Sequence, residues 1–333
     1  MPVSIYDIAK EANVSPSTVS RALQDNPHIG AKTKARIQKL AQKMGYIPSA
    51  VAQSLVTNKT WTIGVVITTS ADPVVAEVVD GIEQVAQDAN YAVFLGNSRN
   101  DPQREMAVVE TFRRRRVDAI IVVASRVGKT YGSLQSQHSV PILVVEPQEH
   151  SGYHHSISTD NKGGAMLAVE HLIALGHRKI GYVGAIDRPI SNNDRMLGYT
   201  TALTQANIPV VLDLISLPYC TDDIERGQMG VTDVLAAKAT AVFCYNDRTA
   251  IGLMNACGQH GIEVPGMLSV VGFDDIEAAT YIKPALTTIR QHLFRLGQAA
   301  MQTTLSLINE QDPPDIVLPY NLVVRQSTTV VPS

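Results

Sequence analysis

The chain has 333 residues, a net charge of −3 and 45% hydrophobic residues, a composition typical of a soluble globular protein with two or three domains. No apolar stretch approaches the length of a transmembrane helix, and the start of the chain lacks the basic and apolar regions of an export signal, so we expect a cytoplasmic protein without a membrane partner. Three cysteines without metal-ligand spacing are expected to be reduced and structural.

Residues 4–23 predict two short helices across a tight turn. Ser4 is placed to cap the first helix, and Ser15 followed by Pro16 opens the second. In a helix-turn-helix pair the second helix lies in the DNA major groove, with N-terminal side chains such as Ser17 and Arg21 at the base edges. The predicted DNA-contacting residues of this region are Ser4, Tyr6, Ser15, Pro16, Ser17, Thr18, Ser20, Arg21 and His28.

A third helix is predicted after Gly30, and the charge of the whole region fits phosphate binding. Residues 1–60 contain eight lysine and arginine residues and three acidic residues, a net charge of +5, so the rest of the chain carries −8. A basic head on an acidic body indicates that one domain alone binds nucleic acid.

The next segment, residues 47–59, predicts a helix that is too short to be stable alone. Ser49 is placed as its cap, and the residues from Ala50 to Leu55 favour helix. Because so short a helix is marginal in water, we expect it to order only against a partner.

From Thr60 onward, continuous apolar strands alternate with amphipathic helices, a pattern that predicts parallel sheets covered on both faces. The order repeats: Ile63-Gly64 and Gly81-Ile82 recur as Ile180-Gly181 and Gly198-Tyr199, each 117 residues later. We therefore expect two α/β subdomains with a ligand cleft at the carboxyl ends of their strands. The apolar run Val210–Ile215 is predicted to be a buried strand.

Polar side chains that follow or adjoin these strands are candidates for the ligand site. They offer a guanidinium fork, amides and a carboxylate, the set that pairs with vicinal hydroxyls or with a polar ring. Arg195 could instead form a surface salt bridge, Asp274 a strand-end turn, and Asn246 the cap of the following helix. The predicted site residues are Ser191, Arg195, Asn246, Asp274 and Gln291.

Two other kinds of site are not indicated. His150, His154 and His155 cluster without the spacing of a metal site, so no metal is expected. The Gly181–Gly184 segment lacks the third glycine and the acidic residue of a dinucleotide fingerprint, so neither a cofactor nor an enzyme activity is expected.

Taken in order, the motifs YDIAKEANVS, STVSRAL, KTKARI and YIPSAVAQSL have the spacing of the lactose/galactose-repressor (LacI/GalR) family, which this chain resembles. The body resembles the family's periplasmic-binding-protein-like core through STDNKGGAMLAVEHLIALGHRKIGYVG, DRMLGYTTAL, FCYNDRTAIG, SVVGFDDIEAA and KPALTTIRQ. The resemblance covers essentially the whole chain, and the five candidate site residues match effector-contact positions of the family.

The resemblance implies an N-terminal all-α helix-turn-helix domain over 1–46, a hinge helix or linker over 47–59 and an α/β effector-binding core over 60–333. In that fold the chain crosses three times between subdomains, which places 61–161 with 292–321 in the first and 162–291 with 322–333 in the second. It also implies that the hinge folds in the minor groove, where Leu55 wedges into a base step beside Ala52.

The chain departs from the family where many members carry aromatic rings that stack on a ligand. Here the segment reads Asp72-Pro73-Val74-Val75, so a saccharide or related polyol is favoured over a flat purine. The further residues expected at the effector site are Pro73, Val74, Arg99, Glu146 and Tyr219.

These features together predict a ligand-controlled repressor of catabolic genes that binds a palindromic DNA operator as a homodimer. A purine- or nucleoside-responsive regulator of the same architecture is the alternative for the ligand, and an activator is the alternative for the sign of control. A solute-binding protein, the alternative from another class, would use the body but would need an export signal and would have no use for the basic head.

Overall fold

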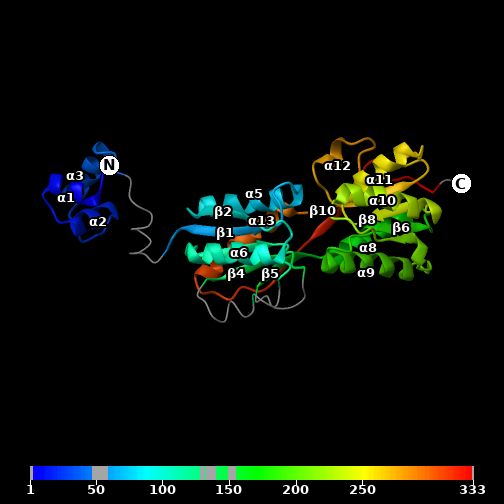
Figure 1. Cartoon of the computed structure of the whole chain (residues 1–333), viewed down its shortest axis with the longest axis horizontal. Helices are drawn as coiled ribbons and strands as arrows, with labels where there is room; N and C mark the ends of the chain where they lie inside the picture. Colours follow the sequence, from blue (N-terminus) through cyan, green and yellow to red (C-terminus); the bar gives the residue numbers. More distant parts are fainter. Residues whose placement is uncertain (1–2, 47–58, 128–130, 132–139, 149–154, 332–333) are drawn as a thin grey trace. The chain divides into compact units, whose positions relative to one another are not determined.

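The computed structural model of the protein describes residues 3–46, 59–127, 131, 140–148 and 155–331 (Figure 1). Most of the predicted hinge, with Ala52 and Leu55, lies outside the described residues. Contacts divide the chain into two compact units, Met1–Thr60 and Trp61–Ser333. Among the described helices, none is both long and apolar enough to cross a membrane.

The first unit is built from three helices, α1 (Ile5–Ala12), α2 (Pro16–Leu23) and α3 (Ala31–Lys43). Ser4 and Asp7 form a capping box at the start of α1, and the Ser15 side chain accepts from the backbone N–H of Thr18 at the start of α2. These caps satisfy backbone donors that a short helix otherwise leaves unpaired. The three helices enclose a small core of Ile8, Ala9, Ala12, Val19, Ala22, Ile37 and Ala41.

The second unit contains two six-stranded sheets. The first has the order β11-β5-β4-β3-β1-β2, and all its strand pairs are parallel. Its strands are β1 (Thr62–Ile67), β2 (Ala92–Asn97), β3 (Ala119–Val123), β4 (Ile142–Val145), β5 (Ser156–Thr159) and β11 (Ile316–Leu318).

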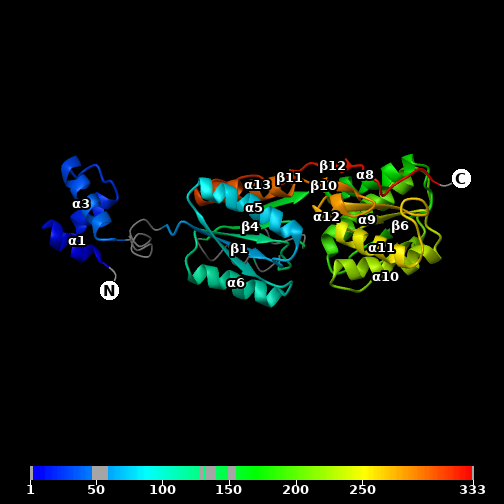
Figure 2. The same ribbon diagram turned by 90° about the horizontal axis from the view of Figure 1, so that it is seen from above.

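Helices cover both faces of this sheet, as its apolar sequence predicts. Figure 2 shows α5 (Pro73–Asp88) and α13 (Leu293–Ile308) on one side of the strands and α6 (Pro102–Arg114) on the other. Ile63 and Val65 of β1 point into the core beneath α5 and α13, whereas the neighbouring Val66 packs with Phe112 of α6. Alternate residues of one strand therefore fill two separate cores.

The second sheet has the order β12-β10-β9-β8-β6-β7. Its strands are β6 (Ile180–Val183), β7 (Ile215–Ser216), β8 (Ala241–Cys244), β9 (Ser269–Asp274), β10 (Thr287–Gln291) and β12 (Tyr320–Val323). Helices α8 (Asn161–Ala174) and α9 (Pro189–Gln205) pack on one face, and α10 (Asp223–Ala236) and α11 (Asp247–Gln259) pack on the other. A short helix, α12 (Ala278–Tyr281), precedes β10.

The two sheets repeat one plan, as the 117-residue repeat in the sequence predicts. β1 and β6 occupy the same position in the two strand orders, and the repeated Ile-Gly pairs lie on these strands. The chain passes between the sheets three times, after Thr159, after Gln291 and after Leu318.

β12 begins at Tyr320 and runs antiparallel to β10, whereas the other strand pairs of the second sheet are parallel. One prediction about this sheet is wrong. The run Val210–Ile215 is not a buried strand: η1 (Leu212–Leu214) is a 3₁₀ turn, and Leu212 is 79% exposed. Only Leu214 of that turn is buried, because a single turn presents one side to the core.

Candidate functional site

The N-terminal unit presents the start of α2 to solvent. Ser15, Ser17 and Arg21 are exposed, whereas Val19 and Ala22 on the opposite side of the helix are buried in the core. The Ser15 hydroxyl lies 2.8 Å from the hydroxyl of Ser17 and also contacts Thr18, so a hydrogen-bonded group of hydroxyls marks the first turn. Such a helix can enter a groove while its inner side stays packed.

The other predicted DNA-contacting residues surround this turn to different degrees. Tyr6 is 71% exposed and His28 is also exposed, whereas Ser4, Pro16, Thr18 and Ser20 are half-buried. Ser4 is engaged in the capping box, since its hydroxyl donates to Asp7 at 2.7 Å. Among the remaining predicted residues, Ala52 and Leu55 lie outside the described part of the chain.

A cavity lies where the carboxyl ends of the two sheets meet, with about 750 Å³ of empty space, part of it open to solvent. Parallel strands bring the residues that follow them to one edge of the sheet, where ligands of such folds bind. The cavity is lined by Thr68, Asp72, Val74, Val75, Val78, Asn100, Val123, Ala124, Arg126, Val145, Glu146, Gln148, Arg188, Ser191, Arg195, Tyr245, Asp274, Gln291, Leu293 and Leu296.

Six of the ten predicted effector residues line this cavity: Val74, Glu146, Ser191, Arg195, Asp274 and Gln291. Pro73 and Arg99 do not, although their neighbours Val74 and Asn100 do. Tyr219 is 88% exposed and lies outside the lining. Four of the ten predicted residues therefore lie outside this lining.

Asn246 has the capping role that the sequence left open. It is buried outside the cavity lining, and its side chain accepts from the backbone N–H of Thr249 at the start of α11. Its amide also donates to Asp223 at 2.8 Å. Both hydrogen-bonding ends of the Asn246 amide are therefore engaged within the protein.

Arg195 is held rigidly at the centre of the site. Its Nε donates to Asn161 Oδ1 at 2.9 Å, and its Nη1 donates to the carbonyl oxygen of Tyr245 at 2.5 Å. The guanidinium carbon lies 3.8 Å from the ring centroid of Phe273 and 4.5 Å from that of Tyr245. Its Nη2 lies 3.8 Å from Asp274, so Arg195 presents a fixed donor beside a carboxylate.

Asp274 is a buried carboxyl at the end of β9. Gln291 Nε2 donates to its Oδ1 at 2.6 Å, and its backbone φ of 119° lies in a region that side chains other than glycine rarely adopt. Burial raises the pKa of Asp274 to about 7, although Arg195 opposes the shift. Beneath it, burial and the charge of Asp274 raise the pKa of Asp247, which accepts from the Ile276 N–H.

Glu146, which follows β4, hydrogen-bonds to residues of β5 and α8. It accepts from the Thr159 N–H at 2.6 Å and from the Asn161 amide at 3.4 Å, and Asn161 in turn accepts from Arg195. Burial raises the pKa of the Glu146 carboxyl. A second link across the cavity is the hydrogen bond from the Ser191 hydroxyl to Gln148, at 3.3 Å.

Sequence reasoning missed several polar residues of the lining, namely Asp72, Asn100, Arg126, Gln148 and Arg188. A signal for two of them was present, because Arg126 and Gln148 closely follow the buried strands β3 and β4. The rule that ligands bind at strand ends applies equally to both sheets. Among the described residues, no cluster of histidine, cysteine and carboxylate side chains could hold a metal ion.

Comparison with known proteins decides the family. Residues 4–49 match the family described as bacterial regulatory proteins, lacI family, and residues 169–328 match the periplasmic binding protein-like domain. The chain is 32% identical to catabolite control protein A of Priestia megaterium, over 98% of this chain and 100% of that protein. The chain belongs to the lacI family. This lacI-family protein is therefore a DNA-binding transcription regulator with an effector-binding domain, and not an enzyme.

Other relatives of this lacI-family regulator support the same assignment. It is 32% identical to the HTH-type transcriptional regulator GalR of Salmonella typhimurium (strain LT2), over 98% of this chain and 96% of GalR. It is also 32% identical to the repressor PurR of Actinobacillus pleuropneumoniae (serotype 5b), over 97% of this chain and 98% of PurR.

Two solved structures resemble the regulator closely. One is a Lac repressor dimer bound to operator and the anti-inducer ONPF, with a TM-score of 0.86, 27% identity and coverage of 99% of this chain and 100% of that chain. The other is a LacI-family regulator of Enterococcus faecium with bound ribose, with a TM-score of 0.73, 30% identity and coverage of 81% of this chain and 100% of that chain.

Proposed function

We propose that this regulator is a cytoplasmic repressor of catabolic genes, which binds a palindromic operator as a homodimer and responds to a polyol effector in the cavity between its sheets. One helix-turn-helix head contacts only a few base pairs, and a two-fold dimer doubles the contact. The Lac repressor that this chain resembles is a dimer on its operator, which supports the same assembly here.

The observation that carries the effector proposal is the fixed donor and acceptor set around Arg195. Arg195 of α9 lies 3.8 Å from Asp274 at the end of β9, and Asp274 lies 2.6 Å from Gln291 at the end of β10. A guanidinium beside a carboxylate can donate to and accept from neighbouring hydroxyl groups of one ligand. The ribose-bound relative supports a sugar or sugar derivative as the ligand class.

A purine or nucleoside is the second candidate, because PurR is among the relatives and the Tyr245 ring lines the cavity. The ring is already engaged, however, with the guanidinium carbons of Arg195 and Arg188 at 4.5 Å and 5.5 Å from its centroid. Val74 and Val75 line another part of the cavity, where they offer aliphatic contact but no stacking surface.

Operator binding tests the DNA half of the proposal. An operator is first selected from a random pool of duplexes and then titrated with the full chain by fluorescence anisotropy. Arg21 is exposed on α2, so Arg21→Ala should weaken specific binding by at least about 1 kcal/mol. Arg104→Ala, which removes an exposed arginine of α6, serves as the matched control. Equal operator affinity of the wild type and Arg21→Ala would exclude α2 as the recognition helix.

A further inference from the structure

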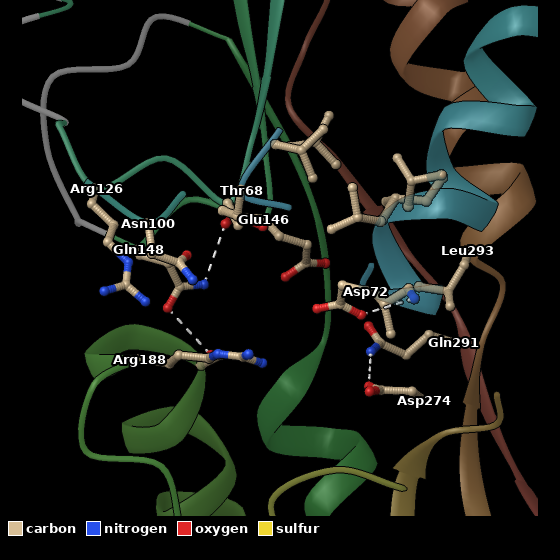
Figure 3. A pocket seen from close by; sticks show the side chains of 18 of the residues that line it. Thr68, Asp72, Asn100, Arg126, Glu146, Gln148, Arg188, Asp274, Gln291 and Leu293 are labelled. Carbon is tan, nitrogen blue, oxygen red and sulfur yellow. Dashed lines mark hydrogen bonds between the residues drawn. The ribbon is translucent and has the colours of Figure 1, made fainter. Parts of the chain in front are cut away.

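The polar groups of the effector cavity are unevenly distributed. Figure 3 separates two groups across the view, with Arg126, Asn100, Gln148 and Arg188 on one side and Asp72, Gln291 and Asp274 on the other. The first group contains two guanidinium groups, whereas the second contains two carboxyl groups. A guanidinium group can donate to hydroxyls, but two of them on one side of a cavity favour an anionic group of the ligand.

Behind these two arginines lies an ion network in which three guanidinium groups share two carboxylates. Arg226 is fully buried and binds both, Asp223 closely and Asp187 at 2.5 Å. Arg188 takes the second oxygen of Asp223 at 3.1 Å. The guanidinium group of Arg126 lies 3.8 Å from Asp187, its nearest carboxylate among the described ion pairs. Within these ion pairs three guanidinium groups meet two carboxylates, and the charges of Asp72 and Glu105 also act on Arg188 and Arg126 respectively. Arg126 has the longest of these ion pairs.

Glu105 also faces Arg126, but its oxygens are bound to other donors. The hydroxyls of Ser125 and Tyr131 each donate to Glu105 Oε1 at 2.6 Å, and the Arg126 backbone N–H donates to Oε2 at 3.3 Å. Glu105 therefore anchors the backbone of Arg126 at the end of β3 without contacting the guanidinium in any described hydrogen bond. It acts as a positioning residue for the Arg126 side chain.

The position of Arg126 is unfavourable for its charge. Burial lowers the pKa of Arg126, and the like charge of Arg188 lowers it further, while Asp187, Tyr245 and Glu105 oppose the shift. Its side chain is 24% exposed, so it is partly removed from water while its donors face the cavity. An anion between Arg126 and Arg188 would add a countercharge beside Arg126, whose ion pair with Asp187 is long at 3.8 Å, and would accept from two planar guanidinium forks.

We propose that the effector is an anionic polyol, whose phosphate or carboxylate group is bound by Arg126 and Arg188 while its hydroxyl groups contact Arg195, Asp274 and Gln291. The inference rests on the proposed function, because both use one cavity. Arg195 is not part of the anion subsite, since its guanidinium already donates to Asn161 and to the Tyr245 carbonyl.

Calorimetric titration of the full chain tests this inference with matched ligands. The probes are glucose, glucose 6-phosphate and gluconate, together with the corresponding galactose set. At least one anionic member should bind at least about tenfold tighter than its neutral counterpart, and its affinity should fall as the NaCl concentration rises. The phosphate and carboxylate members then distinguish the two sources of the negative charge.

Substitutions test whether Arg126 causes the tighter binding of the anionic ligand. Arg126→Gln should remove the preference for the anionic member, because Asp187 remains bound to Arg226 and the fold is kept. Arg248→Gln should retain the preference, since Arg248 lies outside the cavity lining and pairs with Asp222. If Arg126→Gln does not fold, Arg126→Lys keeps the charge but loses the fork, and it should reduce the preference several-fold.

Two outcomes would overturn the inference, and they differ in what they say of the proposed function. If a neutral sugar binds as tightly as its anionic forms and Asp274→Asn abolishes that binding, the anion subsite is wrong while the polyol site stands. If no member of the panel binds, neutral or anionic, both the anion subsite and the polyol effector are wrong.

Discussion

At the scale of a single residue, the buried carboxyl of Asp274 affects both the stability of the protein and the proposed binding of the effector. The folded protein holds its proton with a pKa of about 7, against an ordinary value of 3.8, because the carboxyl is buried. The folded state therefore binds more protons than the unfolded chain in this window, and this group's contribution to stability declines as pH rises from about 4 to about 7. Asp247, whose pKa is also raised, acts with the same sign.

We predict that Asp274→Asn stabilises the ligand-free protein at pH 8 by roughly 1–3 kcal/mol and weakens effector binding. The asparagine oxygen can still accept from Gln291, while the cost of a buried charge is removed. The gain should shrink at pH 5, where the native carboxyl is already protonated. Denaturant unfolding at the two pH values measures both effects.

Asp275→Asn provides the contrasting control for this prediction. Asp275 binds Arg290 and Arg325 at 2.5 Å each, so its removal leaves two arginines without this carboxylate and should destabilise the protein. Destabilisation by Asp274→Asn at pH 8, or an effect of equal size at both pH values, would contradict the role assigned to the buried charge.

At the scale of elements, glycines allow paired helices to approach closely in both halves of the core. Gly81 on α5 packs against the backbone of α13, and Gly198 on α9 packs against the backbone of α8. These two glycines are 117 residues apart and belong to the internal repeat. A Cβ at either position would overlap a backbone carbonyl oxygen of the neighbouring helix.

We predict that Gly198→Ala destabilises the core by at least about 1–3 kcal/mol, because α8 and α9 must separate to admit the methyl group. Gly258→Ala is the matched control, since Gly258 lies in α11 with open space around the added Cβ. It should stabilise by about 0.5–1 kcal/mol through lower backbone entropy in the unfolded chain. A lower denaturant midpoint than the wild type for Gly198→Ala and a higher one for Gly258→Ala would support this account. Destabilisation by both variants would contradict it.

At the scale of the whole molecule, the cavity is the place where a ligand can bias the arrangement of the two sheets. Two contacts connect residues that follow strands of different sheets. They are the Ser191–Gln148 hydrogen bond of 3.3 Å and the Arg126–Asp187 ion pair of 3.8 Å. A ligand that contacts residues following both sheets can bind one arrangement of the sheets more tightly than another. DNA binding can respond to the ligand only through this difference in affinity.

We predict that the coupling between effector and operator is reciprocal. If a saturating effector changes operator affinity by some factor, a saturating operator must change effector affinity by the same factor, typically five- to 150-fold. Anisotropy titration with and without effector, and calorimetry with and without operator, measure the two factors. Ser191→Ala, which removes one link between the sheets, should reduce both factors together. Unequal changes would exclude a single pair of coupled states.

Much of the architecture follows from local signals in the sequence. Ser4 and the Ser15-Pro16 pair define where two helices begin, because the groups that cap a helix lie within one turn of its start. The alternation of apolar strands and amphipathic helices, repeated after 117 residues, was sufficient to predict two similar sheets. These patterns express contacts between residues close in the chain, so they can be read without the fold.

Only the tertiary structure decided the direction of β12, the exposure of Leu212 and the meeting of Arg126 with Arg188. A four-residue strand or a short apolar run has no period that distinguishes its possible environments. Arg126 and Arg188 are 62 residues apart and follow strands of different sheets, β3 and β6. Their juxtaposition depends on how the two sheets are arranged, because no local sequence pattern connects two residues so far apart in the chain.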